Sequence, residues 1–279
     1  MLKAFKIMVL AGIAFVNWFI LVLLFLMFGA SDALAGWGAL LVEAALVGLT
    51  LTPVGEWYFR RVNRLRRPLP DEEKVLRPAF DRVCSRCGVV ETPELFVAHD
   101  CFPNTFAMGQ RTVAVTLGLL EQAKAEEREA VLAHEMGHLL NGDTKVLLVA
   151  FVMSAAGSVA TWVMTIVMAA FSIFSLIIGG VTGDRRFIAL GWFIVAVSWM
   201  LRGVAWLLQK LMQLSFLAVS RAQEYEADAF AARCGFRDGL ISFLSRIAGP
   251  EGPRSLAAAL YATHPSPEAR IEKLMARSW

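Results

Sequence analysis

The chain has 279 residues, of which 57% are hydrophobic and 18% charged, and its mean hydropathy is +0.57. This composition excludes an ordinary soluble globular domain, whose apolar fraction is about 45 to 50%, and favours an integral membrane protein surrounded by a lipid bilayer. The formal net charge of only +3 gives no indication of a nucleic-acid partner.

The first two apolar blocks predict a pair of membrane helices, because about 20 helical residues cross the hydrocarbon layer. They cover residues 7–28 and, more weakly, residues 37–53, where Glu43 should face other helices or water. A cleaved secretory signal is the alternative for the first block, since two lysines precede it and Ala33-Leu34-Ala35 resembles a cleavage site. Its 22 apolar residues exceed the about 7 to 15 of a signal core, which favours a retained span.

Basic residues after the second block predict which side of the membrane the chain faces. Five arginines occupy eight positions there: Arg60, Arg61, Arg64, Arg66 and Arg67. Such clusters flank membrane helices on the cytoplasmic side, and this one suits a membrane flank better than a nucleic-acid surface. We therefore expect residues 60–145 to lie in the cytoplasm.

Residues 60–145 have the pattern of an α+β segment. Helices are expected over residues 71–87 and 121–140, and the acidic opening of the second helix suits the positive end of a helix dipole. Short strands rich in β-forming residues are expected over 95–98 and 112–116.

Two further apolar blocks predict a membrane hairpin. The third block, residues 146–178, has no charged residue in 33 positions, and the fourth begins at residue 187 and continues past Arg202 toward Ser220. The connector over residues 179–186 is rich in glycine and is expected to be a tight loop on the outer side.

The predicted fold class is a mainly α membrane protein with about four transmembrane helices and a cytosolic α+β domain. The expected organisation is two N-terminal membrane helices in residues 1–59, a cytosolic part in 60–145, the membrane hairpin in 146–220 and a second cytosolic part in 221–279.

Two histidines four residues apart predict a metal site. His134 and His138 project from one face of the expected helix, so both can bind one zinc ion. Glu135 lies beside them and can accept a proton from the attacking water without being a ligand, as general-base hydrolysis requires. The alternative, two satisfied histidines and a surface glutamate, is disfavoured because the chain has only four histidines.

A catalytic zinc needs a third protein ligand. Glu224 and Asp228 share a helix face, so Glu224 could bind the metal while Asp228 fixes the tautomer of a ligating imidazole; an ordinary acidic helix surface is the competing interpretation. Each arm of the hairpin has about 40 residues, or about 60 Å of helix, which returns Glu224 to the level of His138. A bilayer covers about half of this length, so Arg202 should lie near the cytoplasmic interface.

Three separated motifs stand in the sequence: His134-Glu135-Met136-Gly137-His138 with Asn141-Gly142-Asp143, then Ser220-Arg221-Ala222-Gln223-Glu224-Tyr225-Glu226-Ala227-Asp228, and His264-Pro265-Ser266-Pro267-Glu268-Ala269-Arg270-Ile271. In this order they resemble the family of membrane-integral zinc metalloproteases that includes HtpX and the type I CAAX prenyl protease. The resemblance covers most of the chain from about residue 75 onward. It implies a gluzincin-type metalloprotease fold with one Zn²⁺ per chain.

The resemblance also implies roles for the matching residues. The zinc ligands and the base would be the residues that the spacing predicts, and Asp228 would orient His134. His264 and Arg270 would steady the tetrahedral oxyanion, a role that their donor groups permit. From the residues alone, His264 before a proline could equally be a loop histidine.

A stretch before the expected strand at 112–116 resembles the Pro-Asn-Ala-Phe-Ala sequence of this family. The residues suggested to bind substrate are Asn104, Thr105, Phe106 and Ala107. Substrate would be added as a strand through main-chain hydrogen bonds, which tolerate many side chains. Thr105 stands where the family usually has alanine, so the nearest pocket may differ in shape. A plain turn before a core strand is the alternative.

The cysteines indicate little. Cys84 and Cys87 form half of a structural zinc pattern with no second pair, and Cys101 and Cys234 stand apart. A cytosolic face would keep all four reduced, so packing is favoured over a metal or redox role.

These features predict a membrane-integral zinc endopeptidase. Four spans favour the HtpX type over the prenyl protease, which has more. The resemblance then implies quality control of membrane proteins, with membrane-protein or unfolded polypeptide substrates and a catalytic domain on the cytoplasmic side of a bacterial inner membrane. Two alternatives are a protease for CAAX-type prenyl peptides and a non-enzymatic scaffold stabilised by zinc. The scaffold is disfavoured because structural zinc sites usually close all four positions. The sequence makes no prediction of the oligomeric state.

Overall fold

The chain divides into two compact units. The computed structural model describes residues 2–248 and 265–277, apart from the side chains of residues 2, 3, 5 and 209–220. The helical unit comprises residues 3–48 and 150–216, and the sheet unit comprises residues 49–149 and 217–279.

In the described part of the chain, four helices are long and apolar enough to cross a membrane, as the hydropathy pattern predicts. They are α1 (Leu2–Met27), α2 (Asp32–Thr50), α7 (Asp143–Thr182) and α8 (Arg185–Ala231). α7 has 40 residues and α8 has 47, so both exceed the about 20 that a bilayer requires.

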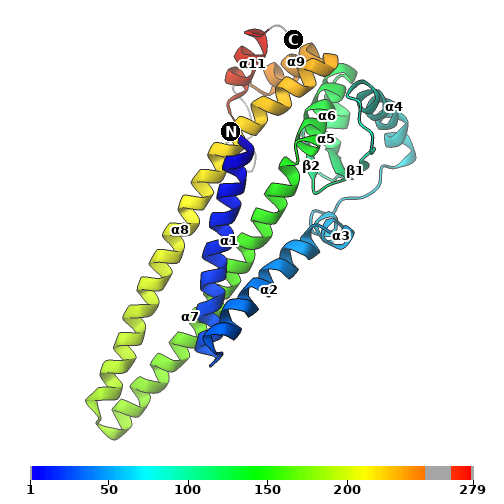
Figure 1. Cartoon of the computed structure of the whole chain (residues 1–279). Coiled ribbons are helices and arrows are strands. Elements are labelled where there is room, and N and C mark those ends of the chain that lie inside the picture. The colour runs from blue at the N-terminus through cyan, green and yellow to red at the C-terminus, as the bar shows by residue number, and fades with distance from the viewer. Residues whose placement is uncertain (1, 249–264, 278–279) are drawn as a thin grey trace. The chain divides into compact units, whose positions relative to one another are not determined.

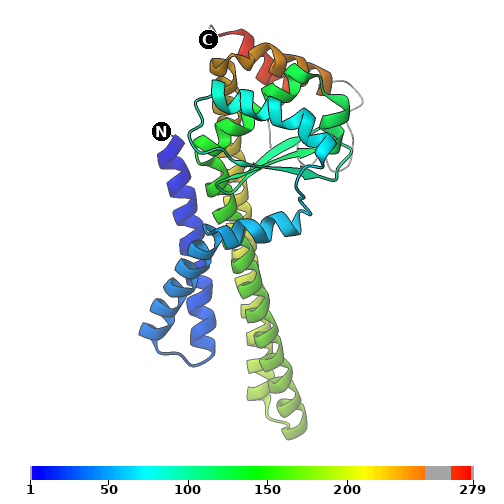
Figure 2. The ribbon, with the colours of Figure 1, turned by 90° about the vertical axis from the view of Figure 1, so that its right-hand side faces the viewer.

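α7 and α8 run side by side as an antiparallel hairpin in both ribbon views (Figure 1 and Figure 2). The side chains of Ser172 and Ser175 on α7 link the two helices. Each donates a hydrogen bond to a carbonyl oxygen of α8, at 3.0 Å for Gly191 and 2.8 Å for Phe187.

The turn of this hairpin is shorter than the sequence suggests. α7 continues through Thr182 and α8 begins at Arg185, so only Gly183 and Asp184 lie between them. The expected loop over residues 179–186 is therefore wrong at both ends. Both Gly179 and Gly180 are part of α7, so its helical hydrogen bonds offset the low helix propensity of glycine.

Two polar side chains of the N-terminal helices are directed into protein. Glu43 of α2 is only 8% exposed, as expected for a carboxylate that avoids lipid. Asn17 of α1 is buried as well, and its amide donates a hydrogen bond to the Met153 carbonyl oxygen of α7. This bond ties α1 to the hairpin.

The sheet unit contains a three-stranded sheet with the order β1-β3-β2. β1 (Glu94–Ala98) and β3 (Thr112–Thr116) are parallel, and β2 (Thr105–Met108) pairs antiparallel with β3. The sequence predicts β1 and β3 to within one residue but indicates no strand over β2. The stretch suggested to bind substrate is thus itself a strand, at one edge of the sheet.

Helices cover this sheet and form the core of the unit. They are α3 (Pro53–Val62), α4 (Pro70–Arg86), α5 (Leu117–Gln122), α6 (Ala125–Leu140), the π-helical turn η1 (Ala232–Phe236), α9 (Arg237–Ile247) and α11 (Pro267–Met275). Figure 2 shows α4 and α6 on the same side of the sheet. Their apolar faces meet β1, β3 and α9 in one buried cluster, in which Phe80, Leu132 and Leu240 are almost fully enclosed. The core therefore fixes α6 against the sheet.

The helix expected over residues 121–140 is in fact two helices. Thr116 caps α5 by accepting a hydrogen bond from the Leu119 amide at 3.2 Å. α6 starts afresh at Ala125, after Lys124 in an extended conformation, and the Glu127 carboxylate accepts from the Lys124 amide at 2.9 Å. Glu126 and Glu127 thus lie in the first turn of α6, where the helix dipole favours negative charge.

The four cysteines are free. Cys84 is buried in the core of the sheet unit, and this burial raises the pKa of its thiol to about 11. Burial and the neighbouring Cys234 thiol of η1 also raise the pKa of Cys87. A buried, protonated thiol is unreactive, which supports a packing role for Cys84.

Candidate metal centre

α6 presents its two histidines side by side. His134 and His138 lie one turn apart, so both rings project from the same face of the helix. Their Nε2 atoms are 3.2 Å apart, and both side chains are largely buried. The rings meet edge to face, which turns both Nε2 atoms toward one point.

α8 brings the third group to that point. Glu224 is 2% exposed, and its two carboxylate oxygens lie 3.4 Å from His134 Nε2 and 3.4 Å from His138 Nε2. Ligand atoms of the three residues all lie within 4.8 Å of one another. The distance that the hairpin arithmetic predicts is therefore confirmed.

A close helix crossing makes this convergence possible. Gly137 of α6 lies against Ala227 of α8, and a Cβ atom built on Gly137 would stand only 3.0 Å from the Ala227 Cα. The contact lies between the two histidines on one helix and between Glu224 and Asp228 on the other. Glycine at this position lets the two backbones approach far enough for the ligands to meet.

Replacing Gly137 with Val should weaken the site without removing any ligand. The added side chain forces α6 and α8 apart at the crossing, so we expect zinc affinity to fall by about 10- to 100-fold, as for altered supporting contacts, and stability to fall by about 1 to 3 kcal/mol. Zinc titration and thermal unfolding of the purified protein measure both effects. Gly180→Val is the matched control because a Cβ on Gly180 meets nothing within 4 Å. Equal zinc affinity in the two variants would contradict this interpretation, whereas recovery with Ala227→Gly would support it.

Carboxylates behind the histidines fix the ring tautomers. His134 Nδ1 lies 2.9 Å from Asp228 Oδ1, and His138 Nδ1 lies 3.0 Å from Asp143 Oδ2. Gln223 donates a hydrogen bond to the other oxygen of Asp143 at 3.0 Å. Each imidazole therefore directs a proton outward through Nδ1 and leaves the Nε2 lone pair for a metal.

Sequence reasoning missed Asp143. It follows His138 by five residues, and Asn141 and Gly142 separate it from α6. Gly142 has φ +72°, a conformation that glycine adopts readily, and this turn places the first residue of α7 beside the second histidine. The signal in the sequence was a helix-breaking Asn141-Gly142 pair after His-Glu-x-x-His, followed directly by a carboxylate.

The three groups fit a zinc ion. Bonds of about 2.0 to 2.2 Å to nitrogen and oxygen in a tetrahedron put neighbouring ligand atoms roughly 3.3 to 3.6 Å apart. The separations of 3.2, 3.4 and 3.4 Å match this edge closely. Two imidazoles and one carboxylate also form a common ligand set of catalytic zinc, which leaves one position open.

Charges around the centre shift the pKa values of its groups. Burial disfavours the charged form of His138, but contacts with Asp143 and Glu224 outweigh it and raise its pKa to about 10. For His134, burial and Arg270 act downward, yet Asp228 and Glu224 raise its pKa above the ordinary value. Burial opposes ionisation of Asp228 as well, but Arg270 and His134 hold its pKa below the usual range.

Zinc affinity should therefore depend strongly on pH. Without metal, His138 keeps its proton until about pH 10, and zinc must displace that proton because it binds the neutral ring. Raising the pH toward that value favours zinc, and we expect about a tenfold gain in affinity per pH unit for each proton displaced. Calorimetry of zinc binding in buffers of different ionisation enthalpy counts the protons released. Affinity that stays constant between about pH 6 and about pH 8 would contradict the assigned pKa direction.

Glu135 stands between the metal centre and the sheet edge. Its Oε2 accepts a hydrogen bond from the Ala107 amide at 2.7 Å, and the Thr105 hydroxyl lies 3.4 Å from its Oε1. It is not among the converging ligands, although it precedes His138 by only three residues. The carboxylate is thus held near the site without occupying a ligand position.

The predicted substrate residues divide into two groups. The backbone of Asn104 is committed to β3, since its amide donates to Thr116 Oγ1 at 2.8 Å and its carbonyl accepts from the Thr116 amide at 3.0 Å. Thr105, Phe106 and Ala107 belong to edge strand β2. The Ala107 amide points away from β3 toward Glu135, and Thr105 shares its orientation because alternate residues face the same edge.

Arg270 of α11 reaches the back of the centre. Its guanidinium donates to both oxygens of Asp228, at 2.8 and 2.5 Å, and lies 3.2 Å from Glu224 Oε2. These carboxylates raise the pKa of Arg270 although its burial acts downward. The sequence indicates Arg270 but not its partners. His264 lies outside the described residues.

Comparisons with known proteins give a consistent result. The model of peptidase family M48 matches residues 70–278. Protease HtpX of Cellvibrio japonicus is 32% identical over 232 residues, which cover 76% of this chain and 74% of that protein. A protease HtpX homolog of Neisseria meningitidis serogroup C is 30% identical over 261 residues, with 86% and 88% covered.

A solved structure shares the fold. The crystal structure of S. mikatae Ste24p aligns with a TM-score of 0.51 at 19% identity and covers 93% of this chain. The chain spans 61% of that protein's length. At this identity the likeness concerns the fold alone.

Proposed function

The chain belongs to peptidase family M48, and from this membership we propose that it cleaves membrane-protein and unfolded polypeptide chains internally, as part of membrane-protein quality control. That it is a zinc metallopeptidase acting on polypeptides follows from the family and from the His134, His138 and Glu224 group. The finer role is the proposal. The observation that supports internal cleavage of polypeptides is the placement of Glu135 beside the metal centre and against edge strand β2.

The proposed chemistry uses the chain's own groups at each proton transfer. His134, His138 and Glu224 would hold zinc, which when bound supplies a Lewis acid for the scissile carbonyl and a water of lowered pKa. Glu135 takes the proton of the attacking water and delivers it to the leaving amine. Asp228 and Asp143 keep the two imidazoles in the tautomer that this step requires.

Oxyanion stabilisation by Arg270 and His264 remains part of the proposal. The Arg270 guanidinium already engages Asp228 and Glu224 through its nitrogens, so its first task would be to position these carboxylates. A contact with the reacting carbonyl would need one N–H to turn from Glu224 toward the substrate. His264 would supply the second donor.

Substrate would bind as an additional strand along β2. The outward-facing main-chain groups of Thr105 and Ala107 would pair with it, which explains tolerance of many sequences. The Ala107 amide donates to Glu135 in the described structure. We propose that substrate takes over this amide, so that Glu135 is released toward water when a peptide lies on the strand.

Replacing Ala107 with Pro tests the strand-pairing proposal. Proline removes the outward amide while an edge strand tolerates it, so we expect kcat/KM for an unfolded polypeptide to fall at least about tenfold, the value of one lost hydrogen bond of about 1.5 kcal/mol. Ala107→Gly retains the amide and is the matched control. Peptide hydrolysis and thermal unfolding are measured for both. Normal activity in a folded Ala107→Pro protein would rule out pairing through this amide.

We also propose the orientation and segment plan of the membrane protein. Membrane helices would occupy residues 1–59 and 146–220 and cross the inner membrane of a bacterial cell. The protease parts, residues 60–145 and 221–279, would lie in the cytoplasm. The arginine cluster after α2 supports this orientation. Cysteine substitutions at Arg64 and Asp184 should be labelled by an impermeant reagent from opposite sides of the membrane; labelling of both from the same side would refute it.

One assay separates this proposal from its rivals. The full-length protein in lipid nanodiscs is given an unfolded membrane protein or a farnesylated CAAX peptide, with and without a chelator. We expect chelator-sensitive cleavage of the membrane protein. Exclusive cleavage of the prenylated peptide would favour prenyl-peptide processing, and zinc content without cleavage of either would favour a scaffold.

A further inference from the structure

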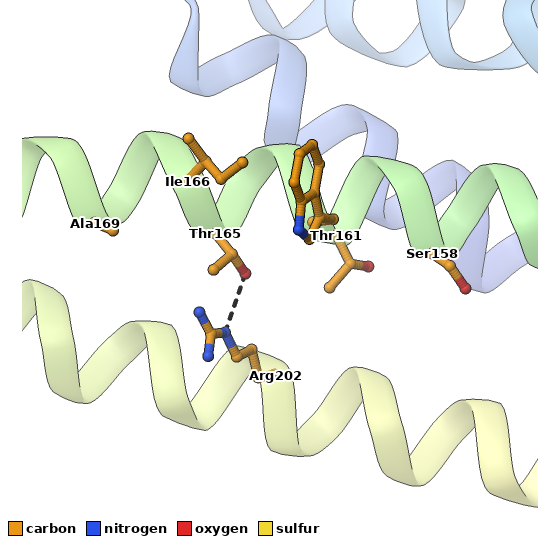
Figure 3. A pocket seen from close by; sticks show the side chains of 7 residues that line it. Ser158, Thr161, Thr165, Ile166, Ala169 and Arg202 are labelled. Carbon is orange, nitrogen blue, oxygen red and sulfur yellow. Dashed lines mark hydrogen bonds between the residues drawn. The ribbon is translucent and has the colours of Figure 1, made fainter.

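A groove on the helical unit lies between α7 and α8, away from the metal centre in sequence. It has a volume of about 580 Å³ and is partly open to the surroundings. Its lining residues are Ser158, Thr161, Trp162, Thr165, Ile166, Ala169 and Arg202. Figure 3 shows Arg202 reaching from α8 toward the row of side chains on α7.

A hydrogen bond from Nε fixes the position of the Arg202 guanidinium in this groove. Nε donates a hydrogen bond to Thr165 Oγ1 at 3.1 Å (Figure 3). The guanidinium also lies 5.5 Å from the centre of the Trp199 ring. No acidic side chain in the described part of the chain forms an ion pair with it. The two terminal nitrogens therefore present a planar fork of donors, whose geometry matches phosphate oxygens.

The position of Arg202 along α8 places it near a membrane boundary. Seventeen residues separate it from Arg185 at the hairpin turn, or about 26 Å of helix. The turn carries three charged residues in succession, Asp184, Arg185 and Arg186, so it belongs at a polar surface. Because the hydrocarbon layer is about 30 Å thick, Arg202 lies close to the opposite boundary, at the depth of phospholipid phosphates.

The groove changes in polarity along its length. On the side of Arg202 toward the hairpin turn it is lined by Ile166 and Ala169, and on the other side by the hydroxyls of Thr161 and Ser158. The Thr161 hydroxyl donates to the Gly157 carbonyl one turn earlier, at 2.8 Å, so its oxygen can still accept a hydrogen bond. This order of apolar, cationic and polar surface matches acyl chain, phosphate and headgroup alcohol of one lipid.

We propose that the groove is a binding site for one anionic phospholipid from the leaflet opposite the hairpin turn. The phosphate pairs with the terminal nitrogens of Arg202, the acyl chain lies along Ile166 and Ala169, and a hydroxylated headgroup such as glycerol donates to Thr161. Trp162, which is 66% exposed, covers the glycerol backbone. Charge complementarity favours an anionic lipid because the described groove contains a cation and no carboxylate.

Lipid retention tests this proposal on the intact protein. The zinc-loaded full chain is reconstituted in vesicles of equimolar phosphatidylglycerol and phosphatidylcholine, extracted in mild detergent and weighed by native mass spectrometry. We expect one phosphatidylglycerol per chain, retained roughly tenfold over phosphatidylcholine, and loss of this preference in Arg202→Gln. Arg186→Gln removes an arginine at the turn, outside the groove, and should keep both the preference and the peptidase activity.

Two further arms keep the result decisive. Thr165→Val retains the charge but removes the acceptor that orients Arg202, so a loss of preference in this variant shows a built site rather than general attraction. Folding of each variant is judged from its zinc content and elution volume. If Arg202→Gln does not fold, Thr165→Val decides the test. Added inorganic phosphate should not displace the lipid. The proposal is overturned if folded Arg202→Gln or Thr165→Val keeps the preference, if phosphate alone displaces the lipid, or if a second copy fills the groove as a cross-linked dimer.

Discussion

Glu135→Gln should lower kcat/KM for a polypeptide substrate by about 10²- to 10⁴-fold, the range for loss of general acid–base catalysis, while zinc content stays unchanged. Glutamine has the same shape, and its amide oxygen can still accept the hydrogen bond from the Ala107 amide. It cannot take a proton from water at neutral pH. Because Glu135 is outside the group of converging ligand atoms, the metal centre should remain intact.

The comparison variant for this prediction is Glu126→Gln. Glu126 lies on the same helix in an exposed position, so it controls for the loss of one negative charge from α6. Hydrolysis of an unfolded polypeptide and zinc analysis of the same preparation give both quantities. If Glu135→Gln kept its zinc and cleaved at the normal rate, the base would have to be another group.

Local sequence patterns were sufficient to predict the membrane helices, from the length of the apolar blocks, and two of the three metal ligands, from their spacing. Hydropathy reveals spans because lipid requires every backbone group to be satisfied within a helix. His134 and His138 lie on one face of α6 wherever that helix begins, so the error in its predicted start did not matter. The third ligand needed one further step, the equal length of the two hairpin arms.

Features that depend on tertiary contacts could not be predicted in this way. Strand β2 has only four residues, and its pairing with β3 defines it more than its composition does. Asp143 reaches His138 only because Gly142 turns the chain between two helices. The partners of Arg270 lie some forty residues away on α8, and no local pattern connects α11 with that helix.

The approach of α6 to α8 shows how a small residue can serve chemistry without taking part in it. In the motif His134-Glu135-Met136-Gly137-His138, the spacing predicts the ligands, but the structure assigns Gly137 its task. A larger side chain would keep the motif's charges and lose its geometry. Metal binding in this protein therefore depends on packing between helices as well as on ligand identity.

Glu224→Gln should remove most of the bound zinc. The substitution replaces an anionic ligand with a neutral amide. Each oxygen of the Glu224 carboxylate lies 3.4 Å from a histidine Nε2 atom. Altered supporting contacts cost about 10- to 100-fold in metal affinity, so loss of a direct ligand should exceed that range. One effect opposes this loss: Glu224 helps to raise the pKa of both histidines, so its removal leaves them easier to deprotonate. Loss of the bond between zinc and the carboxylate should dominate. Easier deprotonation of the histidines only partly relieves the competition between protons and zinc for the two rings.

Excess zinc separates the two glutamate variants. Glu224→Gln should regain part of its activity as zinc is added, whereas Glu135→Gln should gain none because its site is already filled. Glu226→Gln is the matched control for the ligand variant, since Glu226 is exposed on the same helix and faces away from the centre. Zinc content by atomic absorption after dialysis, followed by hydrolysis at increasing free zinc, distinguishes a ligand from a base. Full zinc retention by Glu224→Gln would mean that another side chain completes the site, and the hairpin would then serve only to hold the protein in the membrane.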